Sequence, residues 1–101
     1  MKKYYNCIPP GSFRNLADRH YHATGKRGMI RPQTSLHDFM DKIEEEFYET
    51  RNACTNFGLS GEMIQESVDL CATVINMLKF YNYDFIEEYR KNVEYQESRV
   101  V

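Results

Sequence analysis

Apolar positions follow a helical period in three successive stretches of the chain between residues 35 and 98. The first stretch begins at Ser35, which can cap a helix together with Asp38 three residues later. Its apolar stripe contains Leu36, Phe39, Met40, Ile43, Phe47, Thr50 and Cys54. Residues 56–61 are typical of a turn, so this first helix is expected to end there.

The second stretch is expected to begin after Ser60, a predicted N-cap, and its apolar residues cover an arc of roughly 220° on a helical wheel. One neighbouring helix is too narrow to cover such an arc, so this helix should lie at the centre of a bundle or face another subunit. The third stretch starts near Asp84 and continues to about Ser98, with apolar positions at Phe85, Ile86, Tyr89 and Val93. The pattern therefore predicts an all-α protein.

Residues 1–34 show no sustained period, and prolines and glycines divide them into short segments. We expect a mostly irregular arm with a short helix around residues 13–21, followed by a helical domain over residues 35–101. The arm carries seven Lys or Arg and one acid, a net charge of +6, whereas residues 35–101 carry six Lys or Arg and fourteen acids, a net charge of −8. The basic arm is therefore interpreted as binding nucleic acid, as folding over a polyanionic small substrate, or as a solvated tail attracted to the acidic domain.

Composition excludes several other classes of protein. No apolar run reaches ~18 residues, so no membrane span is expected. The N-terminus lacks the apolar segment of a signal peptide, which favours a cytoplasmic location. The three cysteines are too widely spaced to indicate a disulfide framework or a zinc site, and Cys54 and Cys71 are expected to be small core residues. His20 and His22 form an HxH pair in the arm, which we interpret as incidental rather than metal-binding.

Two acidic clusters on consecutive predicted helices carry the candidate chemistry. Glu45, Glu46 and Glu49 form an EExxE cluster, and Glu66 with Asp69 forms an ExxD cluster. Carboxylates three residues apart share one face of a helix, so two antiparallel helices can direct four of them into one small volume. Carboxylates held so close repel one another unless a cation neutralises them, and Mg²⁺, with Mn²⁺ as an alternative, prefers such oxygen ligands. We therefore predict Glu46, Glu49, Glu66 and Asp69 as metal ligands, and either Glu45 or Glu49 as the general base.

The paired motif resembles the MazG-like nucleoside triphosphate pyrophosphohydrolases of the all-α NTP pyrophosphatase superfamily. The similarity covers residues 35–99 and includes the apolar continuation of residues 74–78 after ExxD. It implies an antiparallel helical bundle of the MazG-like type that assembles as a homodimer or homotetramer. It also implies Mg²⁺-dependent hydrolysis of NTPs or dNTPs to the nucleoside monophosphate and pyrophosphate, with the two acidic pairs as ligands.

Candidate substrate contacts come from both ends of the chain. The family's C-terminal Lys…Tyr-Asn…Arg segment is similar to Lys91, Tyr95 and Arg99 here, with Gln96 in place of Asn and the Lys offset by one, which implies phosphate contacts. Arg27 and Arg31 of the arm are further candidates for binding phosphates. Asn76, two turns beyond Asp69, is a candidate contact to the base or sugar. A nucleoside triphosphate is thus the expected partner, and neither nucleic acid nor a membrane is favoured.

Two alternatives remain open at this stage. One is a non-catalytic helical interaction module, in which the acidic strip faces solvent or a partner and the basic arm grips nucleic acid. The other is an enzyme similar to phosphoribosyl-ATP pyrophosphohydrolase, which shares the helical scaffold.

Overall fold

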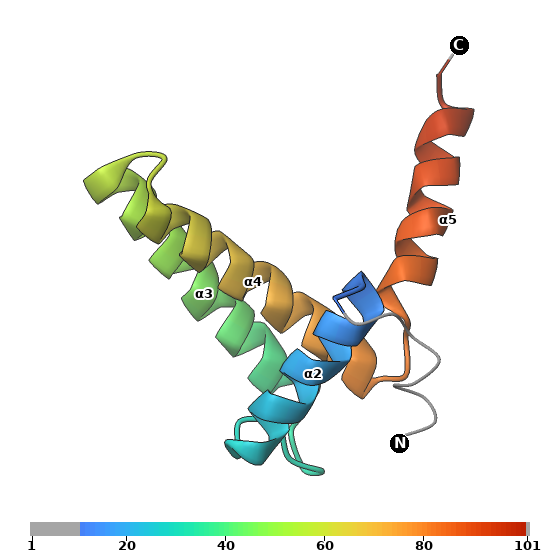
Figure 1. Ribbon diagram of the computed structural model, residues 1–101, viewed down its shortest axis with the longest axis horizontal. Helices are drawn as coiled ribbons and strands as arrows, with labels where there is room; N and C mark the ends of the chain where they lie inside the picture. The colour runs from blue at the N-terminus through green and yellow to red at the C-terminus, as the bar shows by residue number, and fades with distance from the viewer. Residues whose placement is uncertain (1–10, 101) are drawn as a thin grey trace.

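The computed structural model describes residues 11–100, and all regular secondary structure in this range is helical. Its elements are α2 (Phe13–Lys26), α3 (Leu36–Phe57), α4 (Gly61–Phe80) and α5 (Phe85–Ser98). Helices α3 and α4 lie side by side as an antiparallel hairpin, α2 packs against α4 at one end of this hairpin, and α5 leads away from it (Figure 1). The chain is therefore V-shaped, and the all-α prediction with its three helices between residues 35 and 98 is confirmed.

The predicted helix starts are formed by the side chains that the sequence suggested. Ser35 and Asp38 make a complete capping box, in which the Ser35 Oγ accepts from the Asp38 N–H at 3.1 Å and the Asp38 Oδ2 accepts from the Ser35 N–H at 2.9 Å. Ser60 caps α4 by accepting from the Met63 N–H at 3.2 Å. Gly58 ends α3 with a φ of 63°, a conformation that glycine adopts without strain.

The face of α3 that lies against the rest of the chain differs from the predicted stripe. The buried residues of α3 are Phe39, Glu46 and Ala53, spaced seven residues apart, whereas Leu36, Met40 and Phe47 of the predicted stripe are exposed. Cys54 and Cys71 are also exposed, so their prediction as core residues is wrong. The physical reason is that each helix of a hairpin is covered on one side only, and in α3 that side centres on Glu46.

The basic arm is more ordered than its sequence suggested. The helix expected around residues 13–21 is present and extends to Lys26, so the prediction of a mostly irregular arm needs correction over residues 13–26. Residues 1–10 of the arm lie outside the described range. Contacts with α4 explain the extra order: buried Asp18 forms an ion pair with Lys79, and the Lys79 ammonium lies 5.7 Å from the centre of the Tyr21 ring.

The N-terminal end of α2 also contacts the start of α5. The Phe13 and Phe85 rings stack with their centres 5.7 Å apart, and the Arg14 Nη2 lies 2.7 Å from the Asp84 Oδ2. Asp84 at the same time caps α5 by accepting from the Ile86 N–H at 3.2 Å. These contacts hold the α4–α5 junction in place.

Little apolar surface is buried in a single chain. Among the described residues, Phe39 and Ala53 are the apolar side chains classed as buried. The radius of gyration is 15.7 Å, compared with about 13 Å for a compact domain of this length. No helix in the described range is long and apolar enough to cross a membrane.

Phe39 is predicted to be the main apolar anchor of the fold, since its ring packs against Phe80 and Tyr81 at centre distances of 5.2 and 6.2 Å. Phe39→Ala is expected to lower the free energy of unfolding by about 3 kcal/mol, because it leaves a cavity between α3 and the end of α4. The matched control is Phe57→Ala at the other end of α3, where the side chain is 59% exposed rather than 5%. That control should cost less than about 1 kcal/mol. Urea unfolding followed by helical circular dichroism measures both, and equal losses would contradict the assignment.

Candidate functional site

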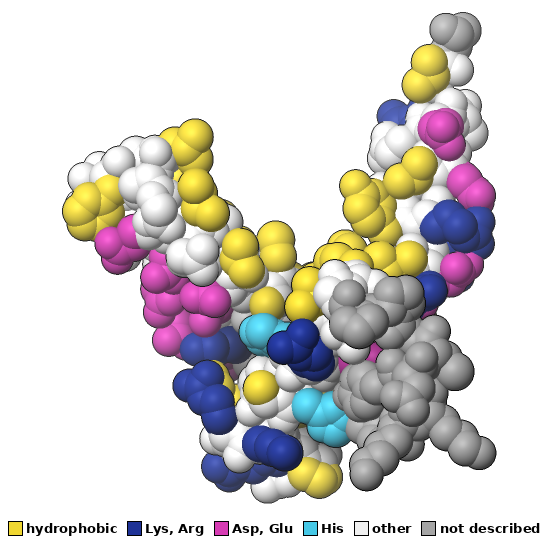
Figure 2. All heavy atoms as spheres, viewed as in Figure 1, with side chains coloured by type: hydrophobic (Ala, Val, Ile, Leu, Met, Phe, Trp, Pro, Cys, Tyr) yellow, Lys and Arg dark blue, Asp and Glu magenta, His cyan; other side chains and the backbone are white. Residues whose placement is uncertain are grey.

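The two acidic clusters meet where α3 and α4 run side by side. One carboxylate oxygen from each of Glu46, Glu66 and Asp69 lies within 4.8 Å of the others, a spacing that permits shared coordination of a metal ion. Glu46 is 7% exposed, Glu66 is half-buried and Asp69 is exposed. The acidic side chains form a continuous patch on one face of the hairpin, with basic side chains directly beside it (Figure 2). The structure thus brings together three of the four predicted metal ligands.

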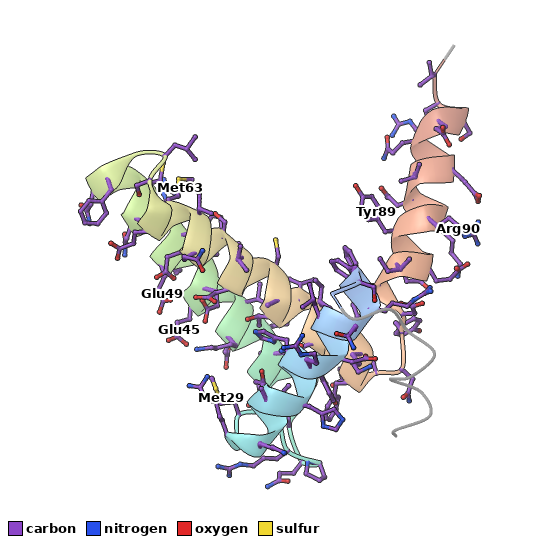
Figure 3. All side chains as sticks on the ribbon, in the orientation of Figure 1. Met29, Glu45, Glu49, Met63, Tyr89 and Arg90 are labelled. Carbon is purple, nitrogen blue, oxygen red and sulfur yellow. The ribbon has the colours of Figure 1, made fainter. Side chains whose placement is uncertain are left out.

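Glu49, the fourth predicted ligand, lies beside this group and interacts with Glu66. The pKa of Glu49 is raised above its ordinary value, first by partial removal from water and then by a hydrogen bond to Glu66 and by the charge of Glu66. Glu45 and Glu49 project from the same side of α3 (Figure 3). Glu49 therefore shares the electrostatic environment of the cluster without being one of its three closest oxygens.

Lys42 partly neutralises the acidic cluster. Its ammonium lies 3.2 Å from the Glu46 Oε1 and 3.4 Å from the Glu45 Oε2. Burial alone would lower the pKa of Lys42, but the hydrogen bonds to Glu46 and Glu45 outweigh it and leave that pKa raised. Glu45 is thus engaged by Lys42 at the edge of the cluster, as a neighbour of the ligand set.

The charged form of the Glu46 carboxylate remains unfavourable even though Lys42 lies beside it. Burial raises the pKa of Glu46, Lys42 opposes this effect, and the charges of Glu49 and Asp69 add to the rise. In addition, the Oε2 atoms of Glu46 and Glu66 are buried without a hydrogen-bond partner among the described residues. Buried polar atoms normally have a hydrogen-bond partner, so each of these two oxygens lacks an interaction that is usual for its position.

A polar pocket of about 450 Å³ opens beside the cluster and has Glu46 and Asp69 in its wall. Its remaining lining residues come from α2, the following loop, α3 and α4. They are His20, Thr24, Arg27, Met29, Ile30, Thr34, Asp38, Phe39, Lys42, Thr73 and Asn76. The pocket combines carboxylates, cations and an apolar wall, and its volume lies in the range of small-molecule sites.

Of the predicted substrate contacts, Arg27 and Asn76 line this pocket. The Asn76 side chain is 4% exposed, and its Nδ2 lies 3.2 Å from the His20 Nδ1. Arg31 is turned back on its own loop, where its Nε donates to the Gly28 carbonyl at 2.9 Å, and it is not part of the pocket lining.

The predicted C-terminal contacts are not brought to the pocket within one chain. Lys91 and Tyr95 are exposed on α5, and the exposed Arg99 caps its C-terminal end; α5 leads away from the α3–α4 hairpin (Figure 1). Lys91 pairs with Glu88 at 3.3 Å, and the Arg99 guanidinium lies 5.6 Å from the centre of the Tyr95 ring. None of these three residues is among those that line the polar pocket in the described part of the chain.

Sequence reasoning missed His20 and Lys42 as pocket residues. Lys42 lies four residues before Glu46, a helical ion-pair spacing that the sequence displays. His20 had no such signal, because its place in the pocket depends on how α2 packs against α4. The interpretation of His20 as not metal-binding is unaffected, since the candidate metal group among the described residues does not include it.

No protein-family model, curated protein or solved structure matches this chain. The candidate site consequently rests on its own geometry.

The raised pKa of Glu46 predicts how stability depends on pH when divalent cations are removed with EDTA. The folded state holds the Glu46 proton more tightly than the unfolded state does. Its contribution to stability is therefore fully present below the ordinary pKa of 4.5 and is lost as the pH rises through the raised value. Glu46→Gln removes this dependence, so its melting temperature at pH 7 should exceed that of the wild type by roughly 4 °C, the effect of about 1 kcal/mol in a small domain.

Melting curves from pH 4.5 to pH 8, recorded by circular dichroism, test this expectation at and above the ordinary pKa of Glu46. The control is Glu97→Gln on an exposed position of α5, which should follow the wild-type curve. A Glu46→Gln variant that is less stable than the wild type throughout would show that the Lys42–Glu46 pair outweighs the burial of the carboxylate.

Proposed function

We propose that this chain is a nucleoside triphosphate pyrophosphohydrolase of the MazG-like type, which hydrolyses an NTP or dNTP to the monophosphate and pyrophosphate. The observation that carries the proposal is the convergence of Glu46, Glu66 and Asp69 from two helices within 4.8 Å, at the wall of a pocket that also contains Arg27 and Lys42. Carboxylates beside cations in one pocket suit a ligand that is anionic and carries a metal ion, which is the form in which a triphosphate binds.

The residues present fit a divalent cation. Hard ions of the Mg²⁺ type take oxygen ligands, and the buried Oε2 atoms of Glu46 and Glu66 are two oxygens without a hydrogen-bond partner among the described residues. Glu46, Glu66 and Asp69 would hold Mg²⁺ or Mn²⁺, with Glu49 beside them. When bound, such an ion neutralises phosphate charge and makes a coordinated water more acidic.

The chain's own residues have distinct tasks in this proposal. Arg27 and Lys42 bind phosphate oxygens, since both are cations in the pocket wall. Glu49 takes the proton of the attacking water, because its raised pKa gives it a higher proton affinity than an ordinary carboxylate has. Glu45 is less suited to this task, since Lys42 already engages its Oε2. Asn76 and Phe39 supply an amide and a ring for the nucleoside part.

The proposed active form is an oligomer, in which a second copy covers the apolar surface of the first. The whole chain exposes 7826 Å², about 1,800 Å² more than a compact monomer of this size. A standard interface needs about 800 Å² from each partner, so the excess is sufficient for a stable dimer.

The exposed apolar surface is concentrated on the inner side of the V (Figure 2). There, α2 and α4 form an apolar groove of about 450 Å³. Its lining residues are Phe13, Leu16, Ala17, His20, Ile64, Ser67, Val68, Cys71, Ala72, Ile75 and Asn76. On α5, Tyr89 points toward the same space (Figure 3). The groove shares His20 and Asn76 with the polar pocket but has none of the acidic residues in its lining, so a second copy in the groove would lie beside the pocket and leave the carboxylates uncovered.

Glu66→Gln tests the catalytic proposal. It is expected to abolish Mg²⁺-dependent pyrophosphate release across a panel of NTPs and dNTPs, and to remove the rise in melting temperature that Mg²⁺ gives the wild type, because one ligand charge is lost. The control is Glu62→Gln, an exposed carboxylate one turn earlier on α4, which should retain both properties.

Normal turnover in Glu66→Gln would remove the site assignment. Absence of turnover in the wild type, together with salt-sensitive polynucleotide binding, would favour the nucleic-acid-binding alternative. Hydrolysis of phosphoribosyl-ATP, without hydrolysis of the NTPs and dNTPs of the panel, would favour the other alternative, an enzyme similar to phosphoribosyl-ATP pyrophosphohydrolase.

The oligomer is tested by light scattering on the purified chain, which should give a mass of two copies or more. Val68→Glu is expected to weaken association roughly 100-fold or more, since it places a charge in an apolar interface. Val68 is 54% exposed and lines the apolar groove. Gln65→Glu, which adds the same charge on the polar side of α4, should leave the mass unchanged. A wild-type mass of one chain would contradict the proposal.

A further inference from the structure

Asn76 is an unusual residue for its position in α4. Its side chain is 4% exposed near the C-terminal end of the helix, where the residues on either side are Ile75 and Met77. A buried amide without hydrogen bonds is costly, so its partners decide whether it is tolerated. Among the described residues, its side chain forms a hydrogen bond with His20 of α2, with the Asn76 Nδ2 3.2 Å from the His20 Nδ1.

The His20–Asn76 pair also divides two cavities. Both residues line the polar pocket, and both line the apolar groove on the other side of α2. The pair is thus part of the wall between the pocket that contains the acidic residues and the surface that faces the inside of the V. His20 itself is exposed, so it belongs to the wall without being required for the core.

We propose that His20 is the positioning residue for Asn76, and that the orientation it gives the amide determines how the nucleoside part of the substrate is bound. The inference deepens the proposed function and rests on it. It concerns a residue from the N-terminal arm, outside the stretch of the chain that contains the acidic motifs.

The chemistry follows from the hydrogen bond. When the His20 Nδ1 accepts from the Asn76 Nδ2, the imidazole is neutral with its proton on Nε2, and the amide cannot rotate without losing this bond. The Asn76 Oδ1 then remains as an acceptor, and no donor to it is present among the described residues. An acceptor fixed in this way recognises an N–H group of a base or a hydroxyl group of a sugar. The substrate class is therefore a nucleotide that offers such a donor to the pocket.

The Thr24 hydroxyl lies beside the His20 ring. The Thr24 Oγ1 lies 3.4 Å from the His20 Nδ1 and donates to the His20 carbonyl at 2.7 Å. Thr24 also lines the polar pocket.

A double-mutant cycle on nucleotide affinity tests the proposal. The probes are the α,β-imido analogues of the four NTPs and four dNTPs, with Mg²⁺, measured by calorimetry on the full chain. For the analogues that the wild type binds, His20→Leu is expected to weaken binding roughly tenfold, because the amide becomes free to rotate. Asn76→Ala should weaken it by at least as much. The double variant should be no weaker than Asn76→Ala alone, since His20 acts only through Asn76.

Two further variants separate positioning from a general structural effect. His20→Asn keeps an acceptor near the position of Nδ1 and should restore most of the affinity. His22→Leu makes the same change two residues along α2 at an exposed position outside the lining of the polar pocket, and it should bind as the wild type does. Circular dichroism spectra of all variants should coincide.

The outcomes distinguish this inference from the proposed function. The positioning role is overturned if the losses of affinity of the two single variants multiply in the double variant, or if His20→Leu keeps full affinity. The enzyme proposal stands in either case. Binding with the expected cycle but without pyrophosphate release overturns the enzyme proposal and leaves the positioning role in place. A wild type that binds none of the eight analogues overturns both.

Discussion

The structure depends on one constraint, which is that the interface between α3 and α4 contains a carboxylate. Glu46 occupies the buried line of α3 between Phe39 and Ala53, at a position where an ordinary hairpin would have an apolar side chain. Like charges from the facing helix lie close to it, and Lys42 offsets them only in part. Such an arrangement lowers the stability of the empty chain, and this cost is typical of sites that bind a cation.

The single chain also has a small apolar core, with Phe39 and Ala53 as the buried apolar side chains among the described residues. Each helix of the hairpin is covered by the other on one side only, and Ile64 and Val68 on a different side of α4 remain exposed. Both features fit the proposal that a cation binds on one face of the chain and a second copy on the other. The acidic patch and the apolar groove lie on different sides of the hairpin, so the two requirements do not compete (Figure 2).

Local signals in the sequence predicted the helices and the acidic pairs well. Ser35, Ser60 and Asp84 cap the helices as expected, because capping depends on residues within one turn. The convergence of Glu46 with Glu66 and Asp69 also followed from spacing alone, since a short turn forces α3 and α4 to pack against each other.

Features that depend on contacts between distant segments could not be predicted in this way. The length of α2 exceeds its weak periodicity because Asp18 and Tyr21 meet Lys79 of α4, far away in the sequence. For the same reason the pairing of His20 with Asn76 has no sequence signal. Cys54 shows that an apolar stripe can also predict too much burial, because the residue belongs to the stripe and is exposed. An apolar stripe marks a face that can be buried, but it does not say whether a single chain buries it.

Helix α2 connects two parts of the molecule that the chain order separates. Its C-terminal half contributes Thr24 to the polar pocket, and its first turn holds Phe85 and Asp84 at the base of α5. A helix of 14 residues is a stiff rod about 21 Å long. A tilt at one end would therefore be transmitted to the other, which would couple the direction of α5 to the width of the pocket.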